Sequence, residues 1–324
     1  MLRILLAICC ALPAAGLTLP AAAQEYPSRP VRVVVSLAPG GNADINARVV
    51  AAALSASFNQ QFIVENRPAA GGTVAVEHVG RSAPDGYTLL VGALGSHVLN
   101  VGLYPNAPVN PITGLAHITI SSESAMVAAS HPSLGARNLA EFRTLLAARP
   151  GVVTFGSSGN GTTGHIAAAL LLHQLGVTGQ HVPYRGSAAA FTDLSAGRVG
   201  FQVDTMSFIA EHIRAGSVVG LVTGGVARGP AIPDVPTGAE AGLPDYVAST
   251  WTPWSAPPGT PPAILELLST RIAEALASGP ARERLLGLGN TIPTGMSPAR
   301  TRAFIEAEAA KWLPVIRATG ATLD

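Results

Sequence analysis

Three glycines in the segment FGSSGNGTTGH have the spacing of a phosphate-binding loop. Gly159, Gly161 and Gly164 form G-x-G-x-x-G, after a β-type run at 152–155 and before a long apolar stretch. This order of strand, glycine loop and helix is what a dinucleotide-binding fingerprint requires. Such a loop can bind an anion, because glycines let the backbone approach closely and a helix N-terminus presents unpaired N–H groups with a partial positive charge.

The loop lacks the other groups that nucleotide sites and hydrolases need. The next acidic residue is Asp193, too distant for the one that a dinucleotide site places about 20 residues onward. Thr162 stands where a Walker A loop requires lysine, and GSSGN does not complete the G-x-S-x-G of a nucleophile elbow. Ser158 could still be combined with His165 and Asp204 as a catalytic triad. A secreted serine-type hydrolase that uses Ser158 is therefore the alternative function.

A loop of the same kind lies earlier in the chain, directly after the first predicted strand. In SLAPGGNAD, a β-branched run leads into Pro39, Gly40 and Gly41, and Asn42 and Asp44 open a helix. Asp44 is expected to stabilise the first turn of that helix rather than to contact ligand. The hydroxyl residues of the loop at 155–165 could likewise serve only as helix caps. Two such loops together favour a cleft that closes on a carboxylate or dianion.

Composition limits the function classes. The chain has 324 residues, of which 48% are hydrophobic and 12% charged, so two packed domains are expected and disorder is excluded. The formal net charge is +1 without a basic block, so nucleic-acid binding has no electrostatic support.

The first 23 residues have the pattern of a secretory signal peptide. Arg3 precedes an apolar run that ends in three alanines, 21–23, before Gln24. An uncleaved membrane anchor is the alternative, which Pro13 and Pro20 disfavour. Both cysteines, Cys9 and Cys10, lie in this segment, so the mature chain is predicted to lack disulfides and thiolate chemistry. His165 and His173 are eight residues apart, which disfavours a metal-binding pair, and no metal or other cofactor is expected.

From residue 26 onward, strands and helices alternate in the pattern of an α/β protein. The predicted strands are 31–36, 62–65, 89–92, 152–155 and 199–203; the predicted helices are 45–58, 74–81, 139–148, 166–175, 188–196, 207–215, 263–277, 281–288 and 298–320. An extended segment at 118–129 is expected to enter a second domain, and VVGLVTGG at 218–225 to return from it. The proline-rich stretch 252–262 is predicted to be a rigid loop.

The chain resembles the Bug family, the extracytoplasmic receptors of tripartite tricarboxylate transporters. The matching stretches are YPSRPVRVVV, PGGNAD, VENRPAAGG, APDGYTLL, GSSGNGTTGH, HVPYRG, AIPDVPTGAEAGLP and APPGTPPAI. The resemblance implies a two-domain periplasmic-binding-protein fold (type II), each domain a mostly parallel sheet flanked by helices, with ligand in the interdomain cleft. We expect domain I at 24–123 plus 224–324 and domain II at 124–223.

The resemblance also implies a function and a set of site residues. The protein is expected to be a monomeric periplasmic receptor, not an enzyme, that captures a small organic carboxylate and passes it to membrane transporter subunits. The implied ligand-binding residues are Pro39, Gly40, Gly41, Asn42, Ser96, His97, Ser157, Ser158, Gly159, Asn160, Gly161, Thr162, Tyr184, Arg185 and Asp204. Arg185 and Asp204 also have simpler explanations, as a surface residue and a helix cap.

Overall fold

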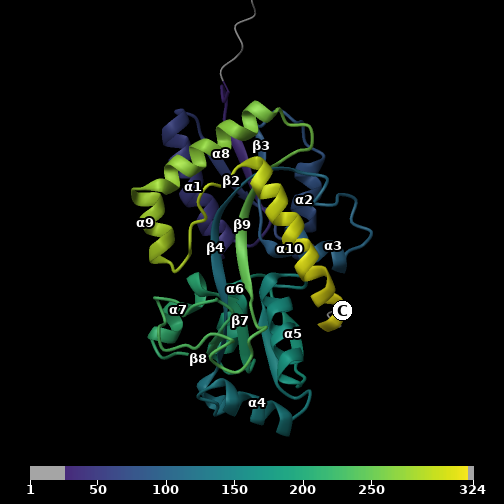
Figure 1. Ribbon diagram of the computed structural model, residues 1–324, viewed down its shortest axis with the longest axis vertical. Helices are drawn as coiled ribbons and strands as arrows, with labels where there is room; N and C mark the ends of the chain where they lie inside the picture. The colour runs from purple at the N-terminus through teal and green to yellow at the C-terminus, as the bar shows by residue number, and fades with distance from the viewer. Residues whose placement is uncertain (1–25, 320–324) are drawn as a thin grey trace, which may run out of the picture.

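The structure, a computed structural model, describes residues 26–319 and has two lobes stacked along its long axis (Figure 1). The predicted signal peptide, residues 1–23, lies outside the described residues. In the described part of the chain, no helix is both long and apolar enough to cross a membrane.

The upper lobe is built on a parallel three-stranded core. Strand β1 (Val31–Val35) lies between β2 (Phe62–Asn66) and β3 (Thr88–Val91) and is parallel to both. Four of its five residues are buried, as the β-branched run predicts for a strand covered on both faces. The covering helices of this lobe are α1 (Asn42–Phe58), α2 (Thr73–Gly80), α8 (Pro262–Ala277) and α9 (Pro280–Gly287).

The lower lobe repeats this plan. Strand β5 (Thr154–Ser157) lies between β6 (Gln180–Pro183) and β7 (Phe201–Thr205) and is parallel to both. Strand β8 (Val219–Thr223) adds to the lobe from the other side of the crossing strand. The helices are α4 (Leu139–Ala148), α5 (Thr163–Leu175), α6 (Ser187–Ser195) and α7 (Met206–Arg214).

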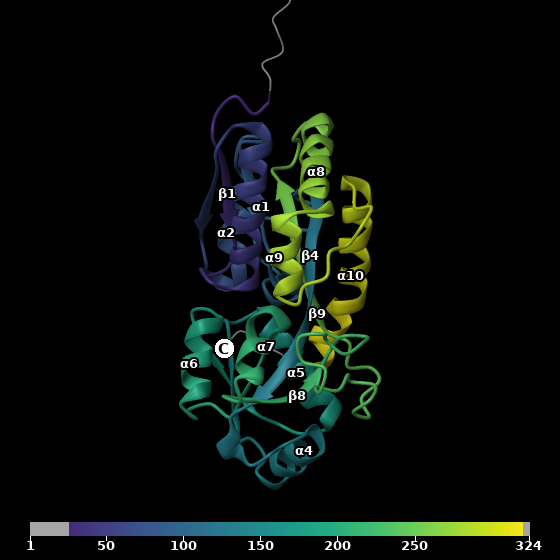
Figure 2. The ribbon, with the colours of Figure 1, turned by 90° about the vertical axis from the view of Figure 1, so that its left-hand side faces the viewer.

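Two long strands join the lobes (Figure 2). Strand β4 (Ala116–Ser130) pairs antiparallel with β9 (Ser249–Ala256) along its first part, and with β7 and β8 along its last part. Helix α10 (Pro298–Thr319) runs alongside and contacts β4, α5 and the short helices at Gly95–Leu99 and α3 (Asn100–Leu103). The molecule is thus an α/β protein of the two-domain periplasmic-binding-protein type.

Two sequence-based expectations about the crossings are wrong. The segment at 218–225 does not return to the upper lobe, because β8 pairs with the last residues of β4. The return strand is β9, which includes part of the proline-rich stretch that was predicted to be a loop. Pro253 cannot donate a backbone hydrogen bond, but it lies opposite Ile120 beside a register shift, where an irregular ladder tolerates proline.

Residues 224–248 pack with the lower lobe. Thr223 bridges to Thr237, and Ile232 and Val235 share a buried cluster with Val127 of β4. We therefore propose that the second division between the domains lies near residue 248, not at 223.

Candidate ligand-binding site

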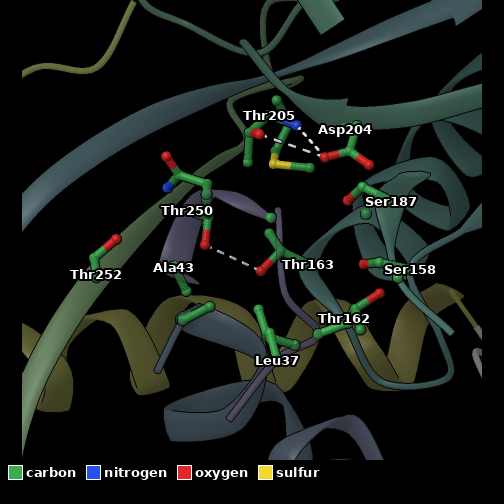
Figure 3. A pocket seen from close by; sticks show the side chains of 17 residues that line it. Leu37, Ala43, Ser158, Thr162, Thr163, Ser187, Asp204, Thr205, Thr250 and Thr252 are labelled. Atoms are coloured by element: carbon green, nitrogen blue, oxygen red, sulfur yellow. Dashed lines mark hydrogen bonds between the residues drawn. The ribbon is translucent and has the colours of Figure 1, made fainter. Parts of the chain in front are cut away.

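A cavity of about 50 Å³ lies between the lobes and is lined by residues from both (Figure 3). The loop after β1 and the N-terminus of α1 form one wall, and the glycine loop before α5 and the starts of α6 and α7 form the other. The lining residues are Leu37, Ala38, Gly41, Asn42, Ala43, Ala93, Met126, Ser158, Thr162, Thr163, Gly164, Gly186, Ser187, Asp204, Thr205, Thr250 and Thr252. We call this the inner cavity.

A larger hollow of about 630 Å³ adjoins the inner cavity and shares five lining residues with it: Leu37, Ala38, Ser158, Thr162 and Gly186. We call it the outer hollow. Its other walls include the turn at 68–72 in the upper lobe and residues 183–186 in the lower lobe.

Four helices begin at the inner cavity. Their N-cap residues are Gly41 for α1, Thr162 for α5, Gly186 for α6 and Thr205 for α7, and all four line the cavity. None of these four residues caps a first-turn backbone N–H of its helix through its side chain. Because first-turn N–H groups have no intrahelical acceptor, each helix can direct backbone donors and a partial positive charge toward a ligand.

The side chains around the inner cavity carry almost no charge. Of the described residues that line it, none is Lys, Arg or His, and Asp204 is the single ionisable one. The cavity can therefore bind an anion through backbone dipoles and hydroxyl groups, without a basic side chain.

The first glycine loop along the chain, at 39–42, contributes two of its four expected residues to the inner cavity. Gly41 and Asn42 line it, whereas Pro39 and Gly40 are exposed outside its lining. Gly40 has φ +82° and donates its N–H to the Asp44 carboxylate at 2.9 Å.

Asp44 supports the loop from behind, as the sequence suggested. Burial alone would raise the pKa of its carboxyl, but hydrogen bonds from Arg48, the Gly40 N–H and Asn66 hold that pKa below its usual value. Asp44 therefore acts as an anion that fixes the start of α1.

The side chains of the second glycine loop, at 155–165, point in different directions. Ser158 and Thr162 line both the inner cavity and the outer hollow, while Gly159 and Asn160 line only the hollow. Ser157 is fully buried and points away from the ligand space, toward His181.

Glycine is required at two positions of this loop. Gly159 has φ +132° and Gly161 has φ +72°, conformations that residues with a Cβ rarely adopt. Gly161 also packs against the Asn100 side chain of the upper lobe. The third glycine of the motif, Gly164, has a packing role: a Cβ there would lie 2.5 Å from the Val203 carbonyl oxygen of β7.

The triad drawn for a hydrolase is not assembled. His165 accepts a hydrogen bond from the Gly161 N–H at 3.3 Å through Nδ1. Within this loop, the serine that contacts a histidine is Ser157, at 2.6 Å from His181 Nε2. Ser157 is fully buried, so its hydroxyl is not open to a substrate.

Asp204 lies at the wall of the inner cavity, 6% exposed. It accepts hydrogen bonds from Gln202 Nε2 at 2.7 Å and from the Thr205 N–H at 2.8 Å. Burial raises the pKa of its carboxyl, although hydrogen bonds from Ser187, Thr205 and Gln202 oppose the shift. The N-cap of α7 is Thr205 and not Asp204, so Asp204 fixes the residue that precedes the helix and lies at the wall of the cavity.

Ser96 and His97 do not reach the ligand space. The Ser96 hydroxyl is bonded to Ser36 and to the backbone of Ala93, and His97 contacts Ser255 at 3.2 Å. Both are buried in the upper lobe. Burial lowers the pKa of His97 to about 3, so it is a neutral core residue.

Tyr184 and Arg185 lie at the outer hollow, not at the inner cavity. The Tyr184 hydroxyl donates to Asp193 at 2.7 Å, which holds that side chain on its own lobe. Arg185 is exposed and lines the outer hollow.

The sequence reasoning missed several lining residues. Ser187 directly follows the YRG segment and opens α6, so the helix start was a usable signal. Thr252 was missed because the stretch 252–262 was predicted to be a loop, and no strand was predicted at Thr250. Thr163 was not among the expected residues, yet it contacts Thr250 across the cavity at 3.2 Å (Figure 3).

The two lobes touch directly around the cavity. Ser207 of α7 donates a hydrogen bond to Asn42 Oδ1 of α1 at 2.9 Å. Gly186 faces Ala38, so closely that a Cβ on this glycine would lie 2.9 Å from the Ala38 Cβ. These contacts enclose the inner cavity.

Comparisons with known proteins match the whole chain. A family model described as "Tripartite tricarboxylate transporter family receptor" matches residues 46–321. The chain is 36% identical over 324 residues to Protein BugT of Bordetella pertussis, covering 100% of this chain and 99% of that protein. Among solved structures, it is similar to MatC from Rhodopseudomonas palustris with bound malate, at 31% identity and TM-score 0.86, over 90% of this chain and 100% of that one. It is also similar to a second R. palustris protein, with adipate, at 32% identity and TM-score 0.88, over 92% and 99% of the two chains.

Proposed function

Because the chain belongs to the family of tripartite tricarboxylate transporter receptors, we propose that it captures a small organic carboxylate between its lobes and delivers it to a membrane transporter. The proposal includes a periplasmic location, a cleaved leader, a monomeric state and the absence of catalytic activity. Malate and adipate in the two similar structures support a carboxylate as the ligand class.

The observation that carries the proposal is the meeting of four helix N-termini at one cavity whose described lining contains no Lys, Arg or His. The N-caps Gly41, Thr162, Gly186 and Thr205 surround a space where Asp204 is the single ionisable group among the described lining residues. A carboxylate there would receive charge-assisted hydrogen bonds of about 1.5–3 kcal/mol each. Three or four of them match the roughly −8 kcal/mol of micromolar binding.

We propose that the ligand is held mainly by Gly41, Asn42, Ser158, Thr162 and Ser187, with Asp204 at the same wall. Arg185 and Tyr184 at the outer hollow would then contact only ligands that extend beyond the inner cavity.

Calorimetry on purified protein tests this function. We expect at least one acid from a panel of malate, succinate, adipate, citrate and aspartate to bind with micromolar affinity and to raise the melting temperature. Light scattering should give a monomer mass. If no carboxylate binds while an ester or amide is hydrolysed, and Ser158→Ala abolishes that hydrolysis, the hydrolase alternative replaces the receptor.

A further inference from the structure

Two histidine rings are stacked behind the second glycine loop. His165, in the first turn of α5, and His181, on β6, have ring centroids 3.8 Å apart and planes inclined by 6°. Phe155 of β5 stacks against His181 at 5.0 Å and against His165 at 6.4 Å. Neither histidine lines the inner cavity or the outer hollow.

Each ring is bonded to a different part of the loop. His165 Nδ1 accepts the Gly161 N–H at 3.3 Å. His181 Nε2 contacts the Ser157 hydroxyl at 2.6 Å, and that hydroxyl accepts the Gly159 N–H at 3.1 Å. The same hydroxyl donates to the Gly159 carbonyl at 3.1 Å, so it receives its hydrogen bond from His181 Nε2–H. The pair therefore acts on the two glycines whose φ angles are positive.

The hydrogen bond at His165 requires a neutral ring. His165 can accept the Gly161 N–H only while its Nδ1 carries no proton. Burial lowers the pKa of His165 to about 4, and burial together with the nearby His165 lowers that of His181 to about 3. Each ring is the titratable neighbour of the other, so protonating one would also oppose protonation of its partner.

We propose that His165 and His181 are positioning residues, a pair of neutral imidazoles that fixes the backbone of Gly159 and Gly161 for the carboxylate without giving it any positive charge. This inference rests on the proposed function and adds the device that shapes its loop. Because the pair lies outside the lining, it acts on affinity through the glycine backbone alone.

The test compares variants that keep or lose the acceptor at Nδ1. His165→Asn places an amide oxygen near the Nδ1 position, whereas His165→Leu removes the acceptor and retains apolar volume. His173→Asn and His173→Leu are the matched controls, since His173 is exposed on the same helix. With malate as probe in calorimetry, we expect His165→Leu to weaken binding about tenfold, His165→Asn to recover most of that loss, and both His173 variants to match the wild type.

A nitrogen NMR titration of the ligand-free protein gives a second readout. We expect both rings to stay neutral from pH 8 to pH 5.5. The single ring proton of the neutral His165 should be on Nε2, because Nδ1 accepts a hydrogen bond. Asp204 also titrates at this cavity and affects both proteins alike. The contribution of His165 to the pH dependence is therefore the difference in malate affinity between the wild type and His165→Asn. We expect that difference to be constant over this range.

Three results would overturn the inference. They are protonated rings at pH 6, malate affinity that rises with falling pH in the wild type but not in His165→Asn, or equal losses in the Asn and Leu variants. If the wild type binds no acid of the panel, the proposed function fails, and the NMR titration still reports whether the rings are neutral acceptors.

Discussion

At the scale of single residues, glycine serves the cavity in two ways. Gly159 and Gly161 supply backbone angles that shape the loop, whereas Gly186 supplies space, because Ala38 of the opposite lobe lies against it. We expect Gly186→Ala to weaken malate binding at least tenfold, since the added methyl group would hold the lobes apart. Calorimetry measures the affinity.

The control for this substitution is Gly216→Ala. Gly216, with φ +71°, lies in the left-handed region, where an alanine costs about 1–2 kcal/mol of backbone strain. Gly186, with φ 113° and ψ 164°, lies in a region that is essentially restricted to glycine, where the strain is about 1–3 kcal/mol, so the two variants are compared by their affinity and not by their stability. No atom lies within 4 Å of a Cβ at Gly216, so that variant should lose stability but not affinity. Equal affinity in the two variants would show that the contact between Gly186 and Ala38 does not limit closure.

A second prediction at this scale concerns the hydrogen bond between the lobes. Asn42→Ala and Ser207→Ala each remove the 2.9 Å bond between Asn42 Oδ1 and Ser207 Oγ. We expect a coupling energy of about 1 kcal/mol toward ligand binding in a double-mutant cycle measured by calorimetry. Additive effects would mean that the two side chains do not act together in the bound state.

The sequence located the two loops but not the direction of their side chains. Glycine spacing and helix starts predict where backbone donors gather, and five of the expected residues line the inner cavity, among them Asn42, Ser158 and Asp204. Whether a hydroxyl faces ligand or core depends on neighbours distant in sequence. Ser157 turns to His181, and Ser96 to Ser36, and neither partner could be inferred from local pattern.

At the scale of elements, the close contact between α5 and β7 positions the ligand loop. Gly164→Ala would place a methyl group 2.5 Å from the Val203 carbonyl oxygen, which is backbone and cannot move aside. We expect the free energy of unfolding to fall by about 2–3 kcal/mol in urea titrations.

Gly287→Ala is the matched substitution in another helix. Gly287 ends α9, and no atom lies within 4 Å of a Cβ there, so alanine should be neutral or stabilising by up to about 1 kcal/mol. If Gly164→Ala behaves in the same way, α5 has room to shift and the third glycine of the motif has no packing role.

A further prediction concerns the attachment of α10 to β9. Glu308 Oε2 accepts hydrogen bonds from the indole nitrogens of Trp251 and Trp312, both at 3.1 Å. Glu308→Ala would leave two buried donors without an acceptor, so we expect a loss of about 2–4 kcal/mol in unfolding free energy. The exposed Glu306 provides the control, because Glu306→Ala should change stability by less than about 0.5 kcal/mol.

Most elements were predictable because their local patterns agree with their environments. The β-branched run of β1 and the helical spacing in α1 and α8 lead to those elements within a few residues. The failure at β9 has a specific cause: proline argues against a strand, and only the irregular pairing with β4 makes Pro253 acceptable. That pairing joins residues more than a hundred positions apart, which local pattern cannot show.

At the scale of the whole molecule, the two lobes share more than their crossing strands. One buried cluster contains Leu94 and Leu99 of the upper lobe, Ile166 and Leu170 of α5, and Trp312 of α10. The lobes are therefore packed together on the α10 side, with the cavity elsewhere between them. Any movement of one lobe relative to the other would therefore have to bend β4 and β9 about this packed side.

Buried neutral histidines should make the whole molecule sensitive to mild acid. Burial lowers the pKa of His97 to about 3, and those of His117 and His165 to about 4, from an ordinary value of 6.5. Below pH 6.5 the unfolded chain therefore binds protons that the folded protein does not, so stability falls as the pH falls toward 4. Asp204, whose pKa is raised, contributes in the opposite direction.

We expect each of these histidines to lower the free energy of unfolding by about 1–2 kcal/mol at pH 5 relative to pH 7.5, which is observed as a lower urea midpoint. His117→Gln should start from a lower midpoint and show a shallower pH dependence, because one titrating group is gone. A midpoint that is flat or rises toward pH 5 would mean that these rings are already protonated in the folded protein.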